Sequence, residues 1–266
     1  MIPLILHIPH ASTVIPGECR GEFVVDDEAL SRHLAVSTDH FTDELFAMSG
    51  PEITSVVFPI SRLVVDPERF EDDRQETMAS RGLGVLYERG HDGTRIRSKL
   101  PPERRRWYLD RWYYPHHAAL DSAVTLALER HGAALIIDCH SYPEIPLAVD
   151  LHQSVPRPDG CFGTSDPHTP RWLVEAGLRF ATEHAWTFAV NEPYAGTMVP
   201  MRYFGRDPRV LSVMIEINRG RYMTLTADEA RRTEGFVPVR GFVQGLITAL
   251  RTGATAGSVR GPIMRL

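Results

Sequence analysis

Two short aliphatic runs that end in histidine constrain the fold of this chain most strongly. The run 3–8 is followed closely by His10, and the run 133–138 is followed by His140. Brief apolar segments of this kind, bounded by polar residues, predict buried strands. Ligand sites of open α/β sheets lie beyond the carboxyl ends of the strands. We therefore expect the two imidazoles to lie near a site at one edge of a sheet.

The whole chain, residues 1–266, is expected to form one α/β domain. Helical periodicity alternates with short β-rich segments, which predicts a central, mostly parallel or mixed sheet flanked by helices. The predicted strands are 3–8, 54–58, 62–66, 133–138, 146–151, 186–190 and 210–217. The predicted helices are 27–48, 101–130, 168–184 and 226–250, and the predicted long loops are 68–100 and 152–168.

The charge balance argues against several classes of partner. The formal net charge is -5 and the pI is about 6.2, which removes the broad attraction that nucleic-acid binding usually needs. The sequence shows no signal-peptide pattern and no apolar run of about 18 residues. We therefore expect a cytoplasmic protein without a nucleic-acid or membrane partner.

Cysteine usage restricts any metal site to other ligands. The chain has three cysteines, Cys19, Cys139 and Cys161, and none of them stands in a CxxC spacing. This pattern argues against a disulfide framework and against a cysteine zinc cage. Any metal ion must therefore be held by histidine and carboxylate, and the twelve histidines supply candidates.

A carboxylate within a third predicted strand points to hydrolytic chemistry. Glu216 lies among aliphatic residues, where a carboxylate is costly unless it is paired, metal-bound or used in catalysis. Two strand-end histidines together with such a carboxylate are what a catalytic zinc site needs. Structural interpretations stay open at this point, because Asp138 could cap a loop and Glu216 could pair with an arginine.

Eight motifs, taken in order, resemble the N-formylglutamate amidohydrolase family. They are PHAS (9–12), TDHFTDEL (38–45), SRLVVDPER (61–69), YYPHHAAL (113–120), IIDCHS (136–141), CFGT (161–164), NEPYAGT (191–197) and IEINRGRYM (215–223). The family is distantly similar to zinc carboxypeptidases and to the succinylglutamate desuccinylase and aspartoacylase group. The resemblance implies a zinc-carboxypeptidase-like fold and one Zn²⁺ or other divalent ion. It also implies hydrolysis of N-formyl-L-glutamate, or a related small acidic N-acyl amino acid, to formate and glutamate.

The resemblance implies ligands for the metal ion. His10 and His140 match the histidines that are expected to bind zinc. The carboxypeptidase relatives supply a glutamate three residues after the first histidine, but Thr13 occupies that place here. The segment TDHFTDEL offers Asp39 and Asp43 instead, one turn apart on one face of a helix. We favour Asp39 as the third ligand, because it matches the acidic residue of the family motif, with Asp43 as the alternative.

The resemblance also implies catalytic and substrate-binding residues. Glu216 matches the general base, which then protonates the leaving amine, and Arg62 is a candidate to stabilise the oxyanion. The two carboxylates of the substrate require cations, and arginine can bind a carboxylate through two donors. The predicted substrate-binding residues are Arg62, Asp66, Arg69, His117, Asn191, Gly196 and Arg219, with Arg202 and Tyr194 as further candidates.

Three departures from the family pattern bear on these assignments. His7 falls where the family has an ordinary residue, and we expect it to be structural. His116 replaces an aromatic residue, so either His116 or His117 could point inward. Glu68 stands where asparagine is common, which bears on the particular substrate more than on the reaction class.

An esterase or peptidase on the same scaffold and a non-catalytic binding protein are the alternative functions. The sequence indicates neither the oligomeric state nor a role in histidine degradation.

Overall fold

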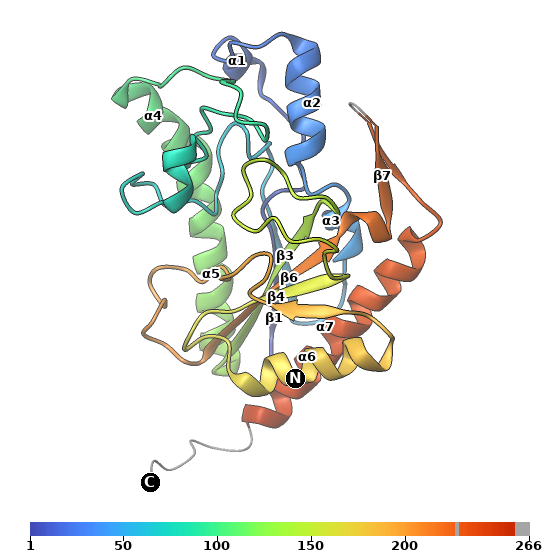
Figure 1. Ribbon diagram of the computed structural model, residues 1–266. Helices are drawn as coiled ribbons and strands as arrows, with labels where there is room; N and C mark the ends of the chain where they lie inside the picture. Colours follow the sequence, from blue (N-terminus) through green and yellow to red (C-terminus); the bar gives the residue numbers. More distant parts are fainter. Residues whose placement is uncertain (227–228, 259–266) are drawn as a thin grey trace.

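A mixed sheet of six strands runs through the computed structural model, which describes residues 1–226 and 229–258 (Figure 1). Its strands are β1 (Leu4–Ile8), β2 (Ile53–Val57), β3 (Ala134–Tyr142), β4 (Gly160–Gly163), β5 (Phe188–Val190) and β6 (Val210–Asn218), in the order β2-β1-β3-β6-β4-β5. β2, β1, β3 and β6 are parallel, whereas β4 is antiparallel to β6 and parallel to β5. The predicted α/β class with a mostly parallel, mixed sheet is confirmed.

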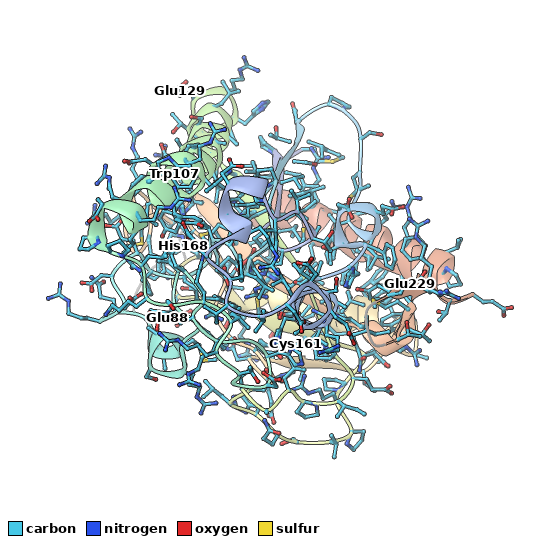
Figure 2. The ribbon with its side chains drawn as sticks, turned by 90° about the horizontal axis from the view of Figure 1, so that it is seen from above. Glu88, Trp107, Glu129, Cys161, His168 and Glu229 are labelled. Carbon is cyan, nitrogen blue, oxygen red and sulfur yellow. The ribbon has the colours of Figure 1, made fainter. Side chains whose placement is uncertain are left out.

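Helices cover both faces of this sheet (Figure 1). α5 packs on one face, and α6 and α7 pack together on the other. The α-helices are α1 (Gly17–Arg20), α2 (Asp27–Ser37), α3 (Thr42–Leu45), α4 (Pro102–Tyr108), α5 (Tyr114–His131), α6 (Arg171–Glu183) and α7 (Phe236–Ser258). The 3₁₀-helices η1 (Thr77–Arg81) and η3 (Arg219–Arg221), the π-helix η2 (Leu109–Tyr113) and the hairpin of β7 (Met223–Leu225) and β8 (Ala230–Arg232) complete the regular structure of the described residues. None of the described helices is both long and apolar enough to cross a membrane. Figure 2 shows Glu129 of α5 and Glu229 of the β7–β8 turn at different margins of the molecule.

The alternation of side chains along the strands explains where the two cores of the sheet lie. On β3, Leu135 and Ile137 belong to the core shared with α6 and α7, whereas Ile136 belongs to the core beneath α5. On β1, Leu6 belongs to the first core and Ile5 to the second. Side chains in step with Ile5 and Ile136 therefore reach the carboxyl edge of the sheet on the α5 side.

A further core lies within the long segment between β2 and α5. This segment has little regular structure, yet its apolar side chains pack with those around α1 and α2. The buried members of this loop core are Cys19, Phe23, Leu30, Phe58, Ile60, Leu63, Val64, Val65, Leu83, Val85, Leu86, Tyr87, Ile96, Tyr108, Leu109 and Tyr113. Their burial orders a segment that would otherwise be a long exposed loop.

Two predicted strands and one helix boundary are wrong. Residues 62–66 form turns, because their apolar side chains are buried in the loop core and not in the sheet. Residues 146–151 contain no strand either. The predicted helix 226–250 begins only at Phe236, after the β7–β8 hairpin, and its residues 227–228 lie outside the described residues.

Other boundaries shift by less. The predicted helix 27–48 divides into α2 and α3, and Asp26 caps α2 by accepting a hydrogen bond from the Ala29 backbone N–H. The predicted loop 152–168 contains β4, a strand too short to show a periodic pattern.

Truncation of one α7 side chain tests the core beneath α6 and α7. Leu246 is fully buried, so Leu246→Ala leaves a cavity and should lower the free energy of unfolding by about 2–5 kcal/mol in urea denaturation. Leu126 of α5 is exposed, and Leu126→Ala should change this free energy by less than about 0.5 kcal/mol. Equal losses in the two variants would contradict the assignment of Leu246 to the core.

Candidate active site

His10 and His140 meet at the carboxyl edge of the sheet. His10 follows β1, and His140 lies near the end of β3, the parallel neighbour of β1. Both side chains are buried, and their ring centroids are 5.0 Å apart. Two residues far apart in the sequence therefore present imidazoles to the same small volume.

One nitrogen of each imidazole is held by a buried aspartate. His10 Nε2 lies 2.9 Å from Asp66 Oδ1, and His140 Nε2 lies 3.1 Å from Asp138 Oδ1. The two Nδ1 atoms lie near a common oxygen, Asp39 Oδ2, at 3.8 Å for His10 and 3.2 Å for His140. His10 Nδ1 is buried and has no hydrogen-bond partner among the described residues. Such an atom is costly in a protein interior, and a metal ion would satisfy it.

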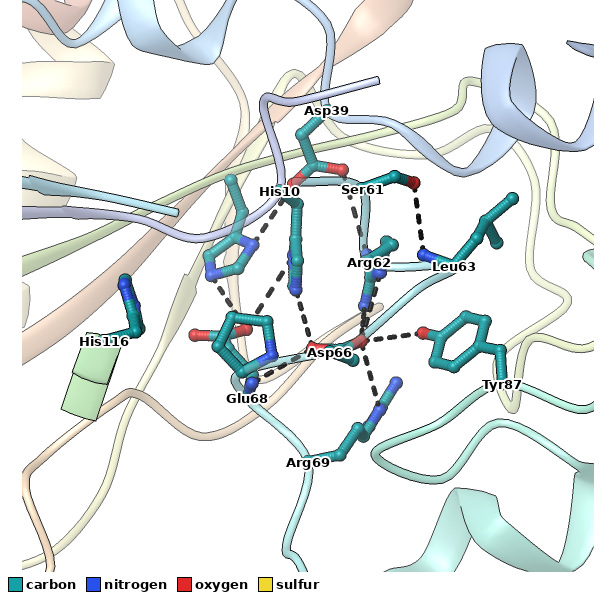
Figure 3. Close-up of polar contacts among 12 residues, drawn as sticks. His10, Asp39, Ser61, Arg62, Leu63, Asp66, Glu68, Arg69, Tyr87 and His116 are labelled. Atoms are coloured by element: carbon teal, nitrogen blue, oxygen red, sulfur yellow. Dashed lines mark hydrogen bonds and ion pairs between the residues drawn. The ribbon is translucent and has the colours of Figure 1, made fainter. Parts of the chain in front are cut away.

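Two carboxylates reach this pair of histidines, and Figure 3 shows both of them, Asp39 and Glu68, near His10. Asp39 is one of them, and Glu68 is the other, because Glu68 Oε2 lies 4.0 Å from His10 Nδ1 and 3.1 Å from His140 Nε2. His10, Glu68 and His140 form a group whose donor atoms all lie within 4.8 Å of one another. Asp43, the sequence alternative to Asp39, is exposed on α3. Imidazole and carboxylate donors in this arrangement fit a divalent ion such as zinc.

Asp39 is ionised in this setting. Burial by itself raises the pKa of the Asp39 carboxyl, but contacts with His10 and His140 and the charge of Arg219 outweigh it, and the pKa lies well below its usual range. Asp39 therefore carries the negative charge that a cation requires.

Glu216 lies beside the histidines without a complete set of partners. It stands on β6 directly opposite His140 in the parallel register. The residue is 7% exposed, and its Oε2 has no hydrogen-bond partner among the described residues. Burial raises the pKa of Glu216 to about 8, although the charge of His140 opposes the shift. A carboxyl group with such a pKa can accept and release a proton near neutral pH.

Two arginines surround Asp66 (Figure 3). Arg62 donates from Nε and Nη2 to Asp66 Oδ2, at 3.1 and 2.8 Å, and the Tyr87 hydroxyl donates to the same oxygen at 2.8 Å. Arg69 Nε lies 3.6 Å from that oxygen and has no hydrogen-bond partner among the residues that the structure describes. The side chains of Arg62 and Arg69 are 18% and 24% exposed. One carboxylate thus orients two guanidinium groups that keep donors for a ligand.

Arg219, the third predicted cation, is engaged by the protein itself. Its Nη2 donates to Asp39 Oδ1 at 2.8 Å, and its Nη1 donates to the Val36 carbonyl at 2.7 Å. Its Nε donates to the Ser141 hydroxyl at 3.2 Å. These contacts leave Arg219 well placed to hold Asp39 in position.

His116 is the histidine of its pair that points inward. His116 Nε2 lies 2.9 Å from His7 Nε2, and His7 Nδ1 lies 2.7 Å from Asp138 Oδ1. Burial lowers the pKa of His116 to about 2, so its imidazole is neutral. His117 Nε2 instead contacts the Pro67 carbonyl at 2.8 Å, and the His117 side chain lines a separate cleft of about 600 Å³.

Three further predicted residues contact other parts of the molecule. Asn191 is exposed, and its amide group exchanges hydrogen bonds with Thr164 at 2.9 and 2.8 Å. The Gly196 carbonyl lies against Gly163 of β4 so closely that a side chain at Gly163 would collide with it. Arg202 lies 3.5 Å from the Asp121 carboxylate and lines the same cleft as His117. None of these contacts joins the three residues to His10 or His140, although the Met198 N–H, two residues after Gly196, donates to Asp138 Oδ2 at 2.8 Å.

Sequence reasoning named Glu68 only as a departure from the family pattern, did not name Tyr87, and left open whether His116 or His117 points inward. Glu68 and Tyr87 belong to the irregular segment after β2. Such a segment has no regular period from which the direction of a side chain could be predicted. Asp138 carried a usable signal, because residues two apart on a strand share a face and Asp138 precedes His140 by two.

Comparisons with known proteins identify the family. The model of the N-formylglutamate amidohydrolase family matches residues 2–223. The crystal structure of N-formylglutamate amidohydrolase from Ralstonia eutropha JMP134 is similar, with a TM-score of 0.79 and 26% identity over 96% of this chain and 94% of that one. The gene product Atu2144 from Agrobacterium tumefaciens shares the fold, with a TM-score of 0.64 and 19% identity over 94% of this chain and 90% of that one. No curated protein sequence matches. From the family match over residues 2–223, this chain belongs to the N-formylglutamate amidohydrolase family.

Proposed function

We propose that this amidohydrolase uses a divalent ion, with zinc as the first choice, to cleave the amide of N-formyl-L-glutamate or a closely related N-acyl amino acid. The products are formate and glutamate. The observation that carries the proposal is the buried, unpartnered Nδ1 of His10 beside His140 and the Asp39 carboxylate. The family match supports the reaction class.

His10 Nδ1, His140 Nδ1 and Asp39 Oδ2 are the proposed metal ligands. Ligand atoms in a tetrahedral zinc site, with bonds of about 2.1 Å, lie roughly 3.4 Å apart. The separations of 3.8 and 3.2 Å between Asp39 Oδ2 and the two Nδ1 atoms are close to this value. Asp66 and Asp138, which contact the other nitrogen of each ring, would fix the imidazoles for binding, as carboxylates behind ligating histidines do.

Glu216 is the proposed general base and acid. A divalent ion bound by the two histidines would polarise the formyl carbonyl and lower the pKa of water. Glu216 takes a proton from the water whose oxygen attacks the formyl carbon. It then delivers a proton to the glutamate nitrogen as the C–N bond breaks. Because Glu216 is buried and its Oε2 is not engaged, its carboxyl group is free to make these transfers.

Arg62 and Arg69 are the proposed cations for the substrate. Arg62 is the candidate for the oxyanion, because it lies between Asp66 and Asp39, with its Nη1 4.0 Å from Asp39 Oδ1. Arg69 is the candidate for a substrate carboxylate, because its side chain is partly exposed and its Nε, 3.6 Å from Asp66 Oδ2, makes no hydrogen bond among the described residues. Both positions favour an acidic N-acyl amino acid over a neutral ester or peptide, since guanidinium groups pair best with carboxylates.

Paired carboxamide variants test the third ligand. Asp39→Asn should lose the zinc ion bound at His10 and His140, measured as the drop in zinc per chain after equilibrium dialysis, because an amide is a poor replacement for a charged ligand. Glu68→Gln should retain the ion at the two histidines. The reverse pattern would make Glu68 the third ligand. Full retention of zinc in both variants would show that neither carboxylate is a metal ligand.

Glu216→Gln tests the proton transfer. We expect kcat to fall by about 10²- to 10⁴-fold, since an amide cannot accept the proton of water, while the zinc content and the circular dichroism spectrum stay unchanged. Glu183→Gln, an exposed position on α6, is the matched control and should keep full turnover. Near-normal kcat in Glu216→Gln would assign the proton transfer to another group.

A change at Arg69 tests substrate recognition. Arg69→Lys should raise KM for N-formyl-L-glutamate by about tenfold or more, because a lost charged hydrogen bond costs about 1.5–3 kcal/mol. An N-formyl amino acid with an apolar side chain, assayed in parallel, should show which substrate carboxylate Arg69 binds. Arg206→Lys, at an exposed position, controls for the general effect of the substitution. An unchanged KM for every substrate would exclude Arg69 from the pocket.

A further inference from the structure

Two histidines outside the candidate active site lie with their ring nitrogens face to face. His33 belongs to α2, and His91 belongs to the segment between η1 and α4. Their Nδ1 atoms are 3.1 Å apart, and the rings meet edge to face with centroids 4.9 Å apart. Asp92 completes a group in which one donor atom from each residue lies within 4.8 Å of the others.

The backbone around this group is shaped to bring the histidines together. Gly90 lies directly against His33, and a Cβ at Gly90 would fall 2.2 Å from His33 Nδ1. The turn that presents His91 is closed by hydrogen bonds from the Gly90 N–H to the Thr94 carbonyl and from the Gly93 N–H to the Gly90 carbonyl. Both the close approach and the closed turn fix the position of His91 relative to α2.

The donors are in the chemical form that binds metal. His33 is buried, and its burial lowers the pKa of the imidazole; burial and the neighbouring His33 likewise lower the pKa of His91. Both shifts favour the neutral imidazole, in which one ring nitrogen offers a lone pair. The Nδ1–Nδ1 contact is a hydrogen bond, so binding of a metal ion would move the proton on one Nδ1 to the Nε2 of the same ring. Asp92 is exposed and supplies a negative charge at the mouth of the group. Ligand atoms of a tetrahedral zinc site lie roughly 3.4 Å apart, and the Nδ1 atoms are already near that spacing.

We propose that His33, His91 and Asp92 form a second metal site, for a divalent ion of the zinc, cobalt or nickel class. Two imidazoles and one carboxylate are donors that these ions accept, with water completing the coordination. The bound ion would link α2 to the segment after η1. Its role is structural, because the group lies outside the residues proposed for catalysis.

Metal stoichiometry of the full-length protein tests the site. The chain is freed of metal with a chelator, dialysed against a series of Zn²⁺ concentrations and analysed for bound zinc. We expect two ions per chain for the unchanged protein and one for His91→Gln, with activity on N-formyl-L-glutamate retained. His152→Gln, at an exposed histidine in another loop, is the matched control and should keep both ions.

Further variants separate this proposal from the proposed function. Asp92→Asn changes an exposed side chain. It should raise the dissociation constant of the second zinc ion by at least about tenfold while the fold is kept. Asp39→Asn together with His91→Gln should bind no zinc, whereas Asp39→Asn alone should keep the ion at His33. One ion per chain that disappears in His91→Gln supports the second site and counts against metal at His10 and His140. Equal zinc binding by the unchanged protein, His91→Gln and Asp92→Asn would overturn the proposal.

Discussion

The parallel register of β1, β3 and β6 is the constraint on which the candidate site depends. It places His7 opposite Asp138 and His140 opposite Glu216. Because side chains alternate between faces, all four project from the α5 side of the sheet, in step with the apolar residues Ile5 and Ile136. A slip of one residue in either pairing would send these groups to the face that α6 and α7 cover. The apolar core therefore fixes the register, and the register positions the polar groups.

Burial of so many charged groups is tolerated because the buried aspartates have arginine or histidine partners. Asp66 is held by Arg62 and His10, and Asp39 by Arg219 and His140. A buried charge without such partners would cost several kcal/mol. Some buried side-chain atoms have no hydrogen-bond partner among the described residues, and two of them, His10 Nδ1 and Glu216 Oε2, lie where we propose that a metal ion and a substrate bind.

Local patterns in the sequence were sufficient to predict that His10, His140 and Glu216 lie in or just after strands of the sheet. His10, His140 and Glu216 stand in or directly after strands, where period and polarity report on position. The contribution of Glu68 could not be predicted in this way, because it follows a segment without secondary structure. The apolar run 62–66 has the composition of a strand, but the loop core buries it through turns. The local sequence pattern predicts that these residues are buried. It does not predict which part of the molecule they pack against.

The irregular segment after β2 therefore has a demanding role. It places Arg62, Asp66 and Arg69 beside the histidines, although it forms no strand whose hydrogen bonds to a sheet could hold it in place. Its order comes from the loop core on one side and from contacts with α2 on the other, among them the approach of Gly90 to His33. α2 in turn leads directly into Asp39, and Arg219 holds the end of α2 by contacting both Val36 and Asp39. Packing at α2 thus sets the spacing between the carboxylate and the arginines of the site, which is why a link between His33 and His91 would stabilise the arrangement without touching a reacting atom.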